Sequence, residues 1–97
     1  MKTLDVSDYM VLVDEAAKYV PYAVRPSLIA LLFAQRDLDA VALLDRDDLA
    51  RKIRDVADDT LVLEDAEFAK LVTAVKTFKG YTKNDVTLVR RILDASK

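Results

Sequence analysis

The chain has 97 residues, with 15 basic and 17 acidic side chains and a formal net charge of −2. A chain of this length forms one domain, and its 53% hydrophobic content favours a folded core over disorder. It contains no cysteine, histidine or tryptophan, which excludes disulfides, thiol nucleophiles, the common zinc ligand sets and imidazole catalysis. No apolar run reaches the roughly 18 residues of a membrane span, so we expect a cytoplasmic protein.

The first segment, residues 7–20, has a helical pattern. Ser7 can cap such a helix and Pro21 ends it. The apolar positions that recur at helical spacing along one face are Val6, Met10, Val13, Ala17 and Val20. Residues 9–13 also form a continuous apolar run, which a short buried strand would show equally well. We expect a helix here and leave the strand open.

The next expected helix is the most apolar part of the chain. Pro26 suits the first turn of a helix, where the missing N–H is not needed. Residues 28–34 follow without a polar side chain, and a helix that is apolar all round is usually buried on every side. We therefore place this segment at the centre of the fold.

Two further helices are expected in the acidic middle of the chain. Asp37 or Asp39 can cap a short segment over residues 40–44. Asp45 and Asp48 resemble a capping pair for the helix that follows. The residues that would face inward on this helix are Leu49, Ile53, Val56 and Ala57.

The last third of the chain predicts an extended step and two helices. Residues 61–63 are an extended connector, and Leu63 can pack on Phe68 at the start of a helix that Gly80 stops. The inward positions of that helix are Phe68, Leu71, Val72, Val75 and Phe78. Thr82 and Asp85 can cap a closing helix. Its expected inward residues are Val86, Val89, Ile92 and Leu93. The fold class that follows is all-α: a compact bundle of five or six short helices in a single helical domain, residues 1–97.

The charges are segregated along the chain. Residues 37–67 carry eleven acidic and four basic side chains, whereas residues 69–97 carry seven basic and two acidic ones. The best candidate for a binding surface lies in the basic part and comprises Lys76, Lys79, Tyr81, Lys83, Arg90 and Arg91. Two helices joined by a tight turn have the outline of a DNA-binding helix-turn-helix. However, Lys76 stands where that motif places a small residue. Basic residues in the last turn of a helix are also expected without any nucleic acid, because they interact favourably with the helix dipole. Nucleic-acid binding is therefore the disfavoured alternative.

The sequence lacks residues that the common catalytic and ligand-binding motifs require. A single glycine cannot build a phosphate-cradling loop. A calcium loop starting at Asp45 would need an oxygen ligand and a glycine where Leu49 and Ala50 stand. The carboxylate pairs, Asp37 with Asp39 and Asp58 with Asp59, could bind a divalent ion or act in acid–base catalysis if they were buried together, but carboxylates at helix starts are more often simple caps. We expect no catalytic residues, no metal, no cofactor and no enzymatic activity.

Three segments in the second half of the chain resemble those of a known class of proteins. They read DLARKI at residues 48–53, LVLEDAEFAKLVTAV at residues 61–75 and LVRRILDA at residues 88–95. Within residues 44–95, their order resembles small all-helical bacteriophage accessory and assembly proteins. The resemblance implies a phage accessory or assembly protein, found in the host cytoplasm or the virion, with no catalytic residues to carry over.

Apolar residues outside the helical stripes predict self-association. The candidate oligomer surface comprises Tyr9, Leu12, Tyr19, Tyr22 and Leu38. The expected function is that of a non-enzymatic bacteriophage-type interaction protein, either an assembly or structural factor or a modulator of a host protein. Its expected partners are another phage or host protein and further copies of itself, with no membrane contact.

Overall fold

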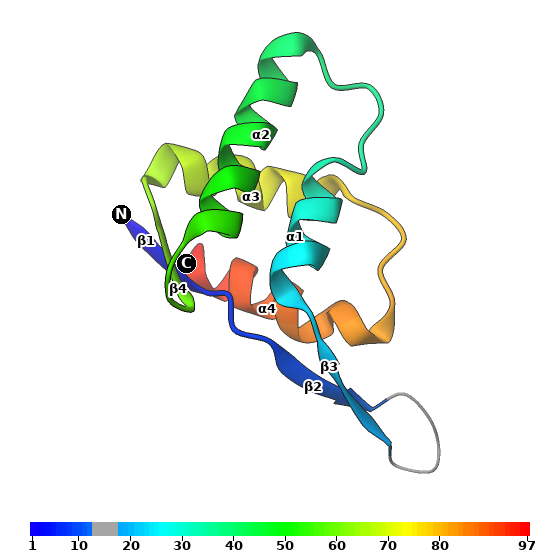
Figure 1. The fold of residues 1–97 in the computed structure, drawn as a ribbon. Coiled ribbons are helices and arrows are strands. Elements are labelled where there is room, and N and C mark those ends of the chain that lie inside the picture. The colour runs from blue at the N-terminus through cyan, green and yellow to red at the C-terminus, as the bar shows by residue number, and fades with distance from the viewer. Residues whose placement is uncertain (13–17) are drawn as a thin grey trace.

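The computed structural model describes residues 1–12 and 18–97, and it is a mixed α/β fold (Figure 1). The described residues form two antiparallel pairs of strands and four α-helices, so the expectation of an all-helical bundle is wrong. Principal extents of 45 × 29 × 25 Å show an elongated molecule, and the β2–β3 hairpin projects from one end of it (Figure 1). Among the described residues, no helix has both the length and the apolar character needed to cross a membrane.

The predicted first helix is replaced by the hairpin of β2 (Tyr9–Leu12) and β3 (Tyr19–Tyr22). Tyr9 pairs with Tyr22 and Leu12 with Tyr19 in an antiparallel register. Exposure alternates from residue to residue along both strands, so the operative period is two and not 3.6. Tyrosine, valine and methionine are well suited to a half-buried pleated surface. The strand alternative for residues 9–13 is confirmed over residues 9–12, whereas Val13 and Ala17 lie outside the described residues.

A second strand pair joins the N-terminus to the middle of the chain. β1 (Lys2–Asp5) pairs with β4 (Thr60–Leu63), and Leu4 stands opposite Leu61. Leu4, Leu61 and Leu63 are buried, because alternate residues of both strands turn toward the helices. The extended step at residues 61–63 is therefore confirmed, and β1 is a strand that the sequence pattern did not predict.

α1 (Val24–Leu32) lies at the centre of the fold, as predicted, but it is not buried on every side: Ala30 is exposed, and Phe33 and Ala34 follow the helix and are exposed as well. Pro26 lies in its first turn, and the Asp8 carboxylate accepts a hydrogen bond from the Val24 backbone N–H at 2.9 Å. It packs on both α2 and α3. Its buried residues are Val24, Leu28, Leu31 and Leu32.

The two helices predicted after residue 39 are a single helix, α2 (Ala40–Asp55). Asp39 is its N-cap and accepts a hydrogen bond from the Ala42 N–H at 2.8 Å, as one of the two predicted caps. Asp45 starts no helix, since it lies inside α2, and its carboxylate instead pairs with Lys70 of α3 at 3.1 Å. Leu49 and Ile53 are buried as predicted, but Ala57 follows the helix and is exposed.

α3 (Asp65–Thr77) and α4 (Val86–Ala95) confirm the two closing helices. The Glu67 carboxylate accepts a hydrogen bond from the Glu64 N–H at 3.0 Å at the start of α3. Gly80 has a φ of 115° in the turn that follows, where a side chain would be strained. A short 3₁₀ turn, η1 (Lys83–Asp85), precedes α4.

The inward face of α4 differs in part from the prediction. Leu88 and Ile92 are buried, whereas Val86 is 47% exposed. Because α4 packs on β1 as well as on α3, its buried stripe is rotated away from Val86. The result is an exposed valine at the beginning of a helix whose other side completes the core.

Replacing Phe68 with alanine tests the core assignment. Phe68 is 2% exposed in α3, so the variant should lose about 3–5 kcal/mol of unfolding free energy. Lys76→Ala, on the exposed side of the same helix, should change it by no more than about 0.5 kcal/mol. Urea denaturation of both variants provides the measurement, and equal losses would contradict the face assigned to α3.

Candidate protein-interaction surfaces

The inner face of the hairpin holds it to the start of α4. The rings of Tyr9 and Tyr22 stack with centroids 4.7 Å apart and planes 15° from parallel. The Tyr9 hydroxyl donates to the Asn84 carbonyl oxygen at 2.9 Å and accepts from the Leu88 N–H at 3.2 Å. Leu88 lies in the first turn of α4, where N–H groups have no partner within the helix. A side chain 79 positions away in the chain therefore caps this helix.

Tyr22 supplies the second contact of the inner face. Its hydroxyl donates a hydrogen bond to the Asp85 carboxylate, which also accepts from the Thr82 N–H at 2.8 Å. Burial, and then the hydrogen bond to Asp85, raises the pKa of Tyr22 above its ordinary value. The hydroxyl therefore stays protonated at neutral pH and acts as a donor that anchors the hairpin, not as a nucleophile or general base.

Arg91 of α4 closes the same cluster. Its guanidinium lies over the Tyr9 ring, 5.0 Å from the centroid, and donates to the Ser7 carbonyl oxygen at 2.7 Å. It also lies 3.7 Å from the Asp5 carboxylate. Hydrogen bonds from Ser7, and then the charge of Arg91, lower the pKa of Asp5. Arg91 was predicted in the basic binding surface, but the structure uses it to fasten the N-terminal segment to α4.

The outer face of the hairpin is apolar throughout the described strands. Met10 and Pro21 form one cross-strand pair, and Leu12 and Tyr19 form the next pair on the same face. Met10 is 57% exposed, Leu12 41% and Tyr19 59%, and Pro21 is exposed as well. We call these four residues the hairpin face. A contiguous group of this kind differs from the single exposed apolar residues that any protein surface carries.

The predicted oligomer surface is therefore divided by the structure. Leu12 and Tyr19 lie on the hairpin face, whereas Tyr9 and Tyr22 point inward to α4. Leu38 is half-buried in the connection between α1 and α2, at the opposite end of the molecule (Figure 1). The sequence prediction missed Met10 and Pro21, which an alternating pattern would have placed beside Leu12 and Tyr19.

The predicted basic surface is divided as well. Tyr81 is half-buried: its hydroxyl donates to the Val75 carbonyl oxygen at 2.7 Å, and its ring packs edge-on against Phe78. Within residues 1–12 and 18–97, four of the predicted cations are exposed and form no ion pair. These four are Lys76, Lys79, Lys83 and Arg90. Arg90 lines a shallow cleft of about 300 Å³ with Tyr81, Thr82, Asp85, Val86 and Val89.

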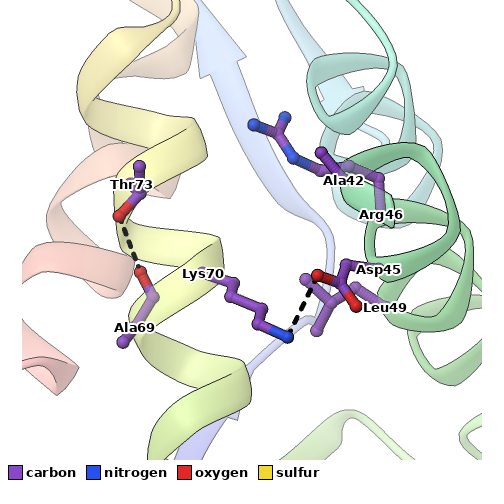
Figure 2. A pocket seen from close by; sticks show the side chains of 7 residues that line it. All are labelled: Ala42, Asp45, Arg46, Leu49, Ala69, Lys70 and Thr73. Carbon is purple, nitrogen blue, oxygen red and sulfur yellow. Dashed lines mark hydrogen bonds and ion pairs between the residues drawn. The ribbon is translucent and has the colours of Figure 1, made fainter. Parts of the chain in front are cut away.

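A further pocket, of about 270 Å³, lies between α2 and α3 (Figure 2). Lys70 reaches across it to Asp45, and Thr73 donates its hydroxyl to the Ala69 carbonyl oxygen at 3.0 Å. Arg46 donates to the Leu32 carbonyl oxygen at 2.9 Å and to Gln35. Each of these polar side chains thus has a partner within the protein. In the part of the chain that the structure describes, no cluster of three acidic side chains could hold a metal ion.

The Tyr22 anchor makes stability sensitive to alkaline pH. Because the pKa of Tyr22 is higher in the folded chain than the ~10 of an unfolded tyrosine, its contribution is complete below about pH 10 and is lost as the pH rises further. Tyr22→Phe should therefore flatten the fall of melting temperature above pH 10. Tyr19→Phe, at the exposed end of the same strand, is the control and should retain the wild-type slope. Identical slopes for Tyr22→Phe and wild type would refute the anchor.

Comparison with known proteins leaves the family open. No protein-family model matches the chain, and neither the curated proteins nor the solved structures include a similar one. The resemblance of residues 44–95 to phage assembly proteins stays an expectation from the sequence. The features that bear on function are therefore the hairpin face and the exposed basic residues around the Arg90 cleft.

Proposed function

We propose that the chain is a non-enzymatic interaction protein of the bacteriophage type, which contacts another protein through the hairpin face. The observation that carries this proposal is the position of Met10, Leu12, Tyr19 and Pro21 on one exposed side of a projecting hairpin. Their inner-face neighbours, Tyr9 and Tyr22, are fixed on α4, so the outer side chains are presented on a held support.

Leaving the hairpin face in water forgoes the free energy that its burial against a partner would contribute. Burying a leucine or methionine side chain contributes about 1.5–3 kcal/mol, and tyrosine is among the residues that dominate binding energy in protein interfaces. Several such side chains side by side supply an anchor for a protein partner. The expected class, an assembly or structural factor or a modulator of a host protein, requires such an anchor and no catalytic group.

Nucleic-acid binding is the second candidate, and one observation favours it. Lys76, Lys79, Lys83 and Arg90 form no ion pair with any described residue, and free cations are what phosphate groups contact. Against it, Arg91 is committed to Ser7 and Tyr9. The Arg90 cleft is moreover bordered by valines, from which phosphate gains nothing. We therefore rank it below protein binding.

Site-specific photo-crosslinking tests the proposal. A benzophenone amino acid at position 19, in cells that naturally make the chain, should give a covalent adduct with a protein. The same group at Val62, which is 48% exposed on β4, controls for a single exposed apolar residue. Adding Leu12→Lys should reduce the adduct at position 19 about tenfold, since a buried leucine is worth more than 1.4 kcal/mol.

The outcomes separate the two candidates. No adduct at position 19 above that at position 62 would contradict the proposal. An adduct with nucleic acid in place of protein would promote the second candidate.

A further inference from the structure

A second exposed apolar group lies on the N-terminal half of α2. Val41 is 70% exposed and Leu44 63%, whereas Leu49 and Ile53 in the C-terminal half of the same helix are buried. Asp48 follows on the same side, since positions i, i+3 and i+7 share one helix face. Asp48 is exposed and forms no ion pair or hydrogen bond with any described residue. We call Val41, Leu44 and Asp48 the α2 stripe.

The cleft at the start of α4 has the complementary character. Its apolar lining is Val89, the half-buried Tyr81 and the exposed Val86. Thr82 and Asp85 line it too, but the Asp85 carboxylate already accepts hydrogen bonds from the Tyr22 hydroxyl and the Thr82 N–H. Arg90 also lines it, as a cation without an ion pair among the described residues. An apolar stripe that ends in a free carboxylate thus has a counterpart in an apolar cleft that ends in a free guanidinium.

The two surfaces cannot meet within one molecule. α2 begins at one end of the fold, whereas η1 and the start of α4 lie toward the other, beside the hairpin (Figure 1). The wider charge distribution agrees with an intermolecular contact, because residues 37–67 are strongly acidic and residues 69–97 are basic. Opposite charges on separate segments of the chain favour association of copies.

We propose that the α2 stripe of one copy docks into the Arg90 cleft of a second copy. Asp48 then lies against Arg90, and Val41 and Leu44 cover Val86 and Val89. Because the two halves of this contact are different surfaces, each bound copy keeps one free stripe and one free cleft. Such a contact builds an open chain or a closed ring and not a two-fold dimer.

A second copy fits this cleft better than nucleic acid does. Phosphate groups would use Arg90 but would leave Val86 and Val89 in water, whereas Val41 and Leu44 bury them. The inference rests on the proposed function only in that both make the chain an interaction protein. It uses surfaces separate from the hairpin face, so one can fail while the other holds.

Mixing two complementary variants tests the contact. Leu44→Lys destroys the stripe and keeps the cleft, and Arg90→Glu reverses the charge of the cleft and keeps the stripe. Both positions are exposed, so folding should be unaffected. In analytical ultracentrifugation at low ionic strength, the wild-type chain should form species larger than a dimer, and each variant alone should be monomeric. An equimolar mixture should recover one good contact per pair and stop at the dimer.

Two substitutions outside the proposed contact serve as matched controls. Val62→Lys and Lys76→Glu make the same kinds of change elsewhere and should leave the wild-type mass distribution intact. Leu12→Lys should lower the crosslink at position 19 without changing the mixing result, which separates this inference from the proposed function. A monomeric wild-type chain, or a mixture that stays monomeric, would overturn the contact. Duplex DNA binding that Arg90→Glu abolishes while self-association persists would also overturn it.

Discussion

The fold depends on how the first turn of α4 is satisfied. The N–H groups that begin a helix lack partners inside it, and at Leu88 the missing partner is the Tyr9 hydroxyl. This bond, the contact of Tyr22 with Asp85 and the position of Arg91 over the Tyr9 ring place hairpin, helix and N-terminal segment in one unit. The hairpin has only two strands, which are marginal alone in water, so its structure depends on these contacts. Its outer face is displayed because its inner face is occupied.

Two adjacent arginines of α4 have different roles: one is engaged in contacts within the fold, and the other has no ion pair among the described residues. Arg91 points to Ser7 and Tyr9, whereas Arg90 lies one position earlier, about 100° around the helix, at the border of the valine cleft. The same separation occurs on α2, where Asp45 pairs with Lys70 while Asp48 has no ion-pair partner among the described residues. The proposed contact between copies uses Asp48 and Arg90, two of the charges that folding leaves unpaired there, whereas the hairpin face is uncharged.

α1 and α3 could be predicted from the apolar residues they carry, whereas α2 was predicted as two helices because Asp45 and Asp48 resemble a cap. Phe68, Leu71 and Val75 lie on one side of α3, and Leu28 and Leu32 on one side of α1. The hairpin could not, because Val6, Met10 and Val20 match a helical period while the alternation from Tyr9 to Leu12 spans only four residues. β1 is equally short, and its strand character depends on β4, whose paired residues are 55 to 61 positions along the chain. Leu12 and Tyr19 were predictable as surface residues. The internal roles of Tyr9, Tyr22 and Arg91 were not, since their partners are 63 to 86 positions away.

Hydrogen exchange of the Leu88 amide measures the coupling between hairpin and helix most directly. The account predicts that this amide is protected in the wild-type chain and that Tyr9→Phe, which keeps the stacked ring but removes the hydroxyl, accelerates its exchange. Amides of the α3 interior, such as that of Leu71, should keep their protection, because the core is unchanged. If Tyr9→Phe left the exchange of Leu88 unaltered, the hydroxyl would not cap α4, and the account of how the hairpin is held would be wrong.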